Sequence, residues 1–208
     1  MKTSLTILKD LNDKGLLYGT EGWSNWIAAI NGGDAVGFMN AIWMIGTLKS
    51  QPANAGKWMV IPTPLLQGVA GAQTASNNGG SSWYVFASSP NKALAVDFLK
   101  SVWATTTEDT LAFYNTILKG AGAMGTYLPS LKGSNYTAKD EFFYKSQAVY
   151  QDFAKWMEKV PVLQYTPNYN PMRTAFANAV QNYFAGKLKT VDETLTAAEA
   201  EYKQVMGQ

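Results

Sequence analysis

The spacing of hydrophobic residues along the chain predicts mostly helices. Leu5, Leu8 and Leu11 lie on one side of a helix over residues 3–13, because positions three or four apart share a helix face. The same criterion predicts further helices at about 24–30, after Pro90, from Thr107, and at about 139–158, 171–185 and 191–206. The dominant secondary structure is therefore expected to be helical.

Polar residues indicate where several of these helices begin. Ser89 is expected to cap the helix that follows Pro90. Glu108 and Asp109 lie in the first turn of the next helix, where the helix dipole favours acidic groups. Thr190 and Glu193 have the spacing of a capping box, which predicts that the last helix begins directly after Thr190.

Short apolar runs between the helices predict strands at residues 35–39, 58–61 and 83–87. The last run, WYVFA, is rich in aromatic and β-branched residues, which favour strands. Residues 66–80 are rich in Gly, Ala, Ser and Asn and are expected to form a loop. Strands separated by helices indicate an α/β fold that is rich in helix and has a small sheet.

Composition excludes several kinds of chemistry. The 208 residues contain no Cys and no His, so disulfides, thiol catalysis and His-dependent catalytic or metal sites cannot form. The formal net charge is +2, and no cluster of Lys and Arg appears, which argues against a nucleic-acid partner. No signal peptide or membrane-spanning stretch is visible. We expect no cofactor and no metal.

Several segments resemble, in order, one known family. They are WSNWIAAINGGDAVGFMNAIW, WMVIPTPLL, GGSSWYVF, SPNKALAVDFLK, GTYLPS and FAGKLKTVDETLTAAEAEY. Together they resemble the C-terminal portion of the extracellular solute-binding proteins of ABC sugar importers, family 1, of the maltodextrin- or oligosaccharide-binding kind. The resemblance covers nearly the whole chain. It implies a periplasmic-binding-protein-like (type II) fold, in which two α/β lobes close over a sugar, and a binding protein rather than an enzyme.

The resemblance also implies how the chain is divided. Residues 1–66 and 127–208 would belong to the C-terminal lobe, and residues 67–126 would cross into the N-terminal lobe. The expected partners are a sugar or oligosaccharide and the permease subunits of an ABC transporter. The protein would act in the extracellular or periplasmic space, tethered to the membrane through a lipid anchor upstream of this chain. Self-association is expected, because the remainder of a lobe would be missing.

The resemblance further implies a set of sugar-binding residues. Trp43 stands where the family has a Trp that stacks on a sugar ring, and Gly79 and Gly80 would let backbone N–H groups approach hydroxyls. Trp83 would provide a second stacking surface. Additional cleft residues are expected before and at the start of the penultimate helix: Tyr165, Tyr169 and Arg173. Structural roles stay open for these residues, including packing for Trp43 and a turn requirement for the glycine pair.

Two other functions stay open from the residues alone. A carbohydrate-active enzyme would need two converging carboxylates and no His. The available acids are Glu21, Asp34, Glu108, Asp109 and Asp140. Most of them are expected at helix N-termini, where capping and the helix dipole explain them. The other possibility is a helical interaction module without a small ligand.

Overall fold

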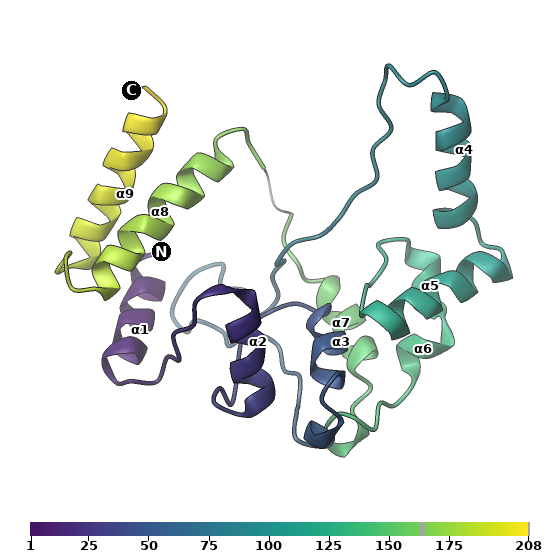
Figure 1. The fold of residues 1–208 in the computed structure, drawn as a ribbon, viewed down its shortest axis with the longest axis horizontal. Coiled ribbons are helices and arrows are strands. Elements are labelled where there is room, and N and C mark those ends of the chain that lie inside the picture. Colours follow the sequence, from purple (N-terminus) through teal and green to yellow (C-terminus); the bar gives the residue numbers. More distant parts are fainter. Residues whose placement is uncertain (163–164, 208) are drawn as a thin grey trace. The chain divides into compact units, whose positions relative to one another are not determined.

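The computed structural model describes residues 1–162 and 165–207, which fall into two compact units. Unit 1 comprises Met1–Glu21 and Val162–Gln208, and unit 2 comprises Gly22–Pro161. Figure 1 shows the helices of both units. Within the described ranges, no helix is both long and apolar enough to cross a membrane.

Unit 1 is built from the first helix and the last two helices of the chain. They are α1 (Lys2–Asp13), α8 (Tyr169–Phe184) and α9 (Val191–Val205). Helices α8 and α9 pack against each other, and their buried residues include three small ones: Ala175, Ala179 and Ala198. The three helices confirm the expectations for residues 3–13, 171–185 and 191–206.

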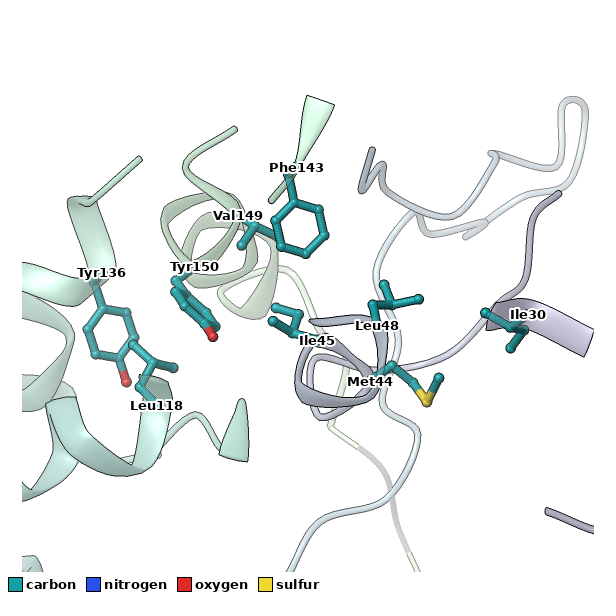
Figure 2. Close-up of a cluster of buried hydrophobic side chains, with 9 residues drawn as sticks. All are labelled: Ile30, Met44, Ile45, Leu48, Leu118, Tyr136, Phe143, Val149 and Tyr150. Carbon is teal, nitrogen blue, oxygen red and sulfur yellow. The ribbon is translucent and has the colours of Figure 1, made fainter. Parts of the chain in front are cut away.

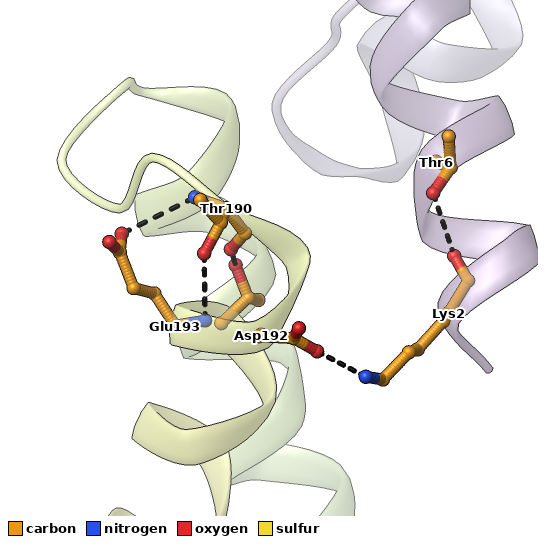
Figure 3. Close-up of polar contacts among 6 residues, drawn as sticks. Lys2, Thr6, Thr190, Asp192 and Glu193 are labelled. Carbon is orange, nitrogen blue, oxygen red and sulfur yellow. Dashed lines mark hydrogen bonds and ion pairs between the residues drawn. The ribbon is translucent and has the colours of Figure 1, made fainter.

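The predicted capping box fixes the start of α9. Thr190 Oγ1 accepts a hydrogen bond from the Glu193 amide at 3.0 Å, and Glu193 Oε2 accepts one from the Thr190 amide at 3.3 Å (Figure 3). Two backbone N–H groups at the start of α9 are thereby paired. Lys2 forms an exposed ion pair with Asp192 in the same turn, which adds little stability.

Unit 2 contains the remaining helices. The α-helices are α2 (Gly22–Gly32), α3 (Met44–Lys49), α4 (Lys92–Trp103), α5 (Glu108–Ala121), α6 (Ser134–Thr137) and α7 (Val149–Met157). Three 3₁₀ segments separate them: η1 (Pro52–Asn54), η2 (Leu128–Lys132) and η3 (Tyr144–Ser146). Nine buried residues of this unit form a hydrophobic cluster, shown in Figure 2: Ile30, Met44, Ile45, Leu48, Leu118, Tyr136, Phe143, Val149 and Tyr150.

Helix boundaries in unit 2 were predicted with mixed success. Thr107 caps α5 and accepts from the Thr110 amide at 3.3 Å, as the sequence predicts. Ser89 does not cap α4: the N-cap is Asn91, and Ser89 Oγ accepts from the Asn91 amide instead. The helix expected from 139 begins only at Val149, because Lys145 and Ser146 adopt left-handed backbone conformations that an α-helix excludes.

The small sheet predicted from the sequence is not confirmed. Residues 35–39, 58–61 and 83–87 form no strand, and the described residues contain only one isolated bridge, a parallel pair between Trp58 and Phe143. At Val60, the side chain of Gln147 donates to the backbone carbonyl at 2.8 Å and accepts from the amide at 2.9 Å. Both groups that a neighbouring strand would bind are thus occupied by one side chain, which ends the ladder after a single bridge.

Candidate functional site

Trp43 lies at the N-terminal end of α3, where the chain turns into the helix. The next residues, Met44 and Ile45, are buried in the core of unit 2 (Figure 2). Trp43 itself keeps 38% of its surface exposed. The buried core therefore holds α3 in place, while the Trp43 indole at the start of this helix stays partly exposed to solvent.

A hydrogen-bonded pair of asparagines holds a polar loop beside Trp43. The Trp43 Nε1–H donates to the backbone carbonyl of Asn78 at 3.4 Å. Asn78 Nδ2 donates to Asn40 Oδ1 at 2.8 Å, and the same oxygen accepts from the Ala41 amide at 2.8 Å. The loop that precedes Gly79 and Gly80 is thereby attached to the turn that carries Trp43.

The backbone conformation of this loop explains a glycine at position 79 but not at position 80. Gly79 has φ +89°, a conformation that L side chains rarely adopt, so a turn requirement explains it. A Cβ at Gly80 would meet no heavy atom within 4 Å. Gly80 is therefore not needed for packing, and its open backbone is accessible to a small molecule.

Gly122 is a positioning residue that the sequence did not single out. It ends α5 in the left-handed conformation, with φ +62°. A Cβ at this position would lie 2.9 Å from the carbonyl oxygen of Ile42 and 3.4 Å from Cα of Trp43. Only glycine permits this close approach between the end of α5 and the turn before α3. A glycine after a predicted helix was the available signal.

Trp83 lies in a second place within unit 2. It is 68% exposed and contacts Trp103 with ring centroids 5.8 Å apart. An open groove of about 450 Å³ surrounds this pair, lined by Trp83, Val85, Val96, Leu99, Lys100, Trp103 and Ala104. A hydrogen bond from α5 holds the backbone at Trp103 in place: the Tyr114 hydroxyl donates to the Trp103 carbonyl at 2.7 Å. Apart from Lys100, this groove offers apolar side chains.

The remaining predicted site residues belong to unit 1. Tyr169 is the first residue of α8, and Arg173 follows one turn later. The rings of Tyr165 and Tyr169 meet edge to face with centroids 5.0 Å apart. The structure thus brings these three residues together at the start of α8, whereas Trp43 and the glycine pair are brought together in unit 2.

Sequence reasoning overlooked Trp23 beside Trp43. The two rings have centroids 5.5 Å apart and planes inclined by 41°. Trp23 also contacts Trp26 at 5.1 Å, and Trp26 continues to Phe38 at 5.5 Å. The helix expected at about 24–30 did not include Trp23, whereas α2 begins at Gly22 and carries both Trp residues.

Three of the candidate acidic residues have structural roles. Asp140 forms an ion pair with Lys49 at 2.5 Å, and Glu108 and Asp109 lie in the first turn of α5. Within the described ranges, no group of three or more acidic side chains could hold a metal ion. Outside this set, hydrogen bonds from Lys9 and Lys203 lower the pKa of Asp13 and that of Glu199.

Comparison with known proteins relates the chain to one family. Residues 2–143 match the model of a family described as bacterial extracellular solute-binding protein. The chain is also 39% identical over 180 residues to the lactose-binding protein of Rhizobium radiobacter. The match covers 86% of this chain and 41% of that relative, so the chain spans less than half the relative's length. Both findings confirm the resemblance seen in the sequence.

Proposed function

Since the chain belongs to the family of bacterial extracellular solute-binding proteins, we propose that it is part of the substrate-binding component of an ABC importer for a sugar or oligosaccharide. Family membership implies a periplasmic-binding-protein-like fold and an extracellular or periplasmic location. The structural observation that carries the proposal is the contact of Trp43 with the Asn78 loop.

This contact supplies the two kinds of group that sugar binding needs. One face of a pyranose presents C–H groups, which the apolar face of an indole can cover. The sugar hydroxyls need hydrogen-bond partners. The amides of Asn40 and Asn78 and the open backbone at Gly80 lie in the turn and loop beside the Trp43 indole. A few polar groups around an apolar surface are typical of small-molecule sites.

The other residues singled out from the sequence are proposed as additional ligand contacts. Trp83 offers an exposed ring. At the start of α8, Tyr165 and Tyr169 offer aromatic faces, and Arg173 offers donors for hydroxyl oxygens. The similar protein is named for lactose binding, and we propose a disaccharide such as lactose as the ligand.

We further propose a division of the chain between two lobes of a type II binding protein. Residues 1–66 and 127–208 would form part of the C-terminal lobe, and residues 67–126 would cross to the N-terminal lobe. The predicted strands would then form once the partner strands of the intact protein are present. The partners are the permease subunits, and an upstream lipid anchor would tether the protein to the membrane.

The exposed aromatic side chains of residues 83–87 support the proposal that this chain alone self-associates. Tyr84 is 87% exposed and Phe86 is 82% exposed. Soluble monomers rarely leave neighbouring large apolar side chains uncovered. A second copy can cover them when the rest of the lobe is absent.

Titration with lactose tests the proposed function. Weak saturable binding, measured by tryptophan fluorescence and calorimetry, is the expected result, because this chain spans only part of the proposed two-lobed protein, and Trp43→Ala should weaken it at least about threefold. Lactose should remain intact on prolonged incubation. Release of monosaccharides would instead indicate a carbohydrate-active enzyme, and an unaltered chain without any response to lactose would contradict the proposal.

A further inference from the structure

Trp23 is exposed to a degree that a core role does not explain. It lies in the first turn of α2 and keeps 54% of its surface exposed. Trp26, one turn later, packs against the hydrophobic core of unit 2. Large aromatic residues are usually mostly buried, and exposed apolar patches commonly mark binding surfaces.

The position of Trp23 relative to Trp43 is set by the core beneath them. The two indoles start different helices, and these helices share the buried side chains of Ile30, Met44 and Leu48 (Figure 2). Tight packing of such a core leaves little freedom to the elements above it. This shared core places the two exposed rings in contact, with centroids 5.5 Å apart and planes inclined by 41°.

Polar groups lie beside this aromatic pair. The Trp43 Nε1–H is directed to the Asn78 carbonyl, and the Asn78 side chain is held by Asn40. In the described contacts, the Asn40 side chain forms two hydrogen bonds, and Oδ1 is the acceptor in both. Its NH₂ group, which has two donors, can thus bind a ligand hydroxyl.

Resting on the proposed function, we propose that Trp23 and Trp43 form a platform for two successive rings of a disaccharide. Trp43 covers the first ring, and Trp23 covers the second. A monosaccharide occupies the Trp43 position alone and gains nothing from Trp23. Trp23 is then the residue that selects a disaccharide over a monosaccharide, since specificity is a difference between two binding free energies.

The test compares lactose with galactose on the whole chain by calorimetry. Trp23→Ala should raise the dissociation constant of lactose about three- to tenfold and leave that of galactose within about twofold. Trp43→Ala should weaken both sugars. Trp23→Leu retains an apolar side chain against Trp26 without an aromatic face, and it should behave like Trp23→Ala. Trp23→Phe should restore part of the preference for lactose.

The controls separate this inference from its premise. Trp156→Phe, at a ring that packs on Phe153 in α7, should change neither affinity. Equal losses for lactose and galactose in the Trp23 variants would reveal a purely structural role and overturn the inference. Unchanged lactose affinity in Trp23→Ala and Trp23→Leu would also overturn it, while the proposed function would stand. Failure of the unaltered chain to bind either sugar would overturn both.

Discussion

The indole N–H of Trp43 donates to the backbone carbonyl of Asn78 at 3.4 Å, across 35 positions of sequence. This bond joins the start of α3 to the loop that leads to Trp83. The Asn78 side chain adds a second connection to Asn40. The candidate ligand surface is therefore an assembly of two segments, and its geometry depends on these few polar contacts.

Asn40→Ala should disturb the candidate site more than the fold. The substitution removes the acceptor for the Asn78 side chain and for the Ala41 amide. Loss of such bonds costs about 1 kcal/mol, which corresponds to about a fivefold weaker affinity for lactose if the loop must be ordered to bind. Fluorescence titration measures the affinity. Asn77→Ala, in the same loop, is the matched control, and an equal effect there would contradict the role of Asn40.

Gly122→Ala should destabilise unit 2 and displace Trp43. The new Cβ would lie 2.9 Å from the Ile42 carbonyl oxygen, at a φ of +62°. Strain of this kind costs about 1–3 kcal/mol, so the thermal transition should shift to lower temperature. Gly120→Ala lies two residues earlier inside α5, where a Cβ meets nothing within 4 Å, and it should stabilise the helix by up to about 1 kcal/mol. Equal stability of both variants would contradict this interpretation.

The helices could be predicted from the sequence because their signals are local. Thr107 and Thr190 bond to amides three residues later, and such caps are readable in the order of residues alone. The six residues of α3 escaped notice, since a helix this short has little periodicity to detect. Its burial depends on the core of unit 2, which is a tertiary property.

Whether a segment forms a strand depends on a pairing neighbour, which the segment's own sequence does not reveal. Residues 83–87 have strand composition, but a strand needs a neighbour for its backbone groups. At Val60 that neighbour is the Gln147 side chain, 87 positions away.

The candidate site could likewise be predicted only in part from the sequence. Trp43 was found through the resemblance, whereas exposure and the contact with Trp23 are properties of the folded chain.

Tyr150→Phe should change how stability depends on pH. Burial, reinforced by the Asp140 carboxylate, raises the pKa of the Tyr150 hydroxyl to about 12, against about 10 in an unfolded chain. Between these values the unfolded state binds fewer protons, so the free energy of unfolding falls as the pH rises. Ionisation of Tyr150 therefore has no effect on the free energy of unfolding below about pH 10 and lowers it between about pH 10 and pH 12. The variant should lose less stability over this range in denaturant unfolding.

At neutral pH the same variant should be slightly more stable. The Tyr150 hydroxyl is buried and has no hydrogen-bond partner among the described residues. Removing an unsatisfied buried hydroxyl should raise the free energy of unfolding by about 1 kcal/mol. Tyr144→Phe, at an exposed ring, is the control and should follow the unaltered chain at every pH. A variant at position 150 that also follows the unaltered chain would contradict both expectations.

Replacing Tyr84 and Phe86 by Ser should reduce self-association of the chain. Both rings are largely exposed, while the alternate residues Trp83 and Val85 line the groove beside α4. An extended segment with apolar side chains on both sides is typical of a strand that is buried on both faces. Another copy of the chain can cover this segment and pair with its backbone.

Light scattering tests this expectation. It should give the unaltered chain a mass above 22.7 kDa and the Tyr84→Ser, Phe86→Ser double variant a mass close to that value. Val162→Ser, at another exposed apolar residue, should leave the mass unchanged, and a monomeric unaltered chain would rule out association through this segment.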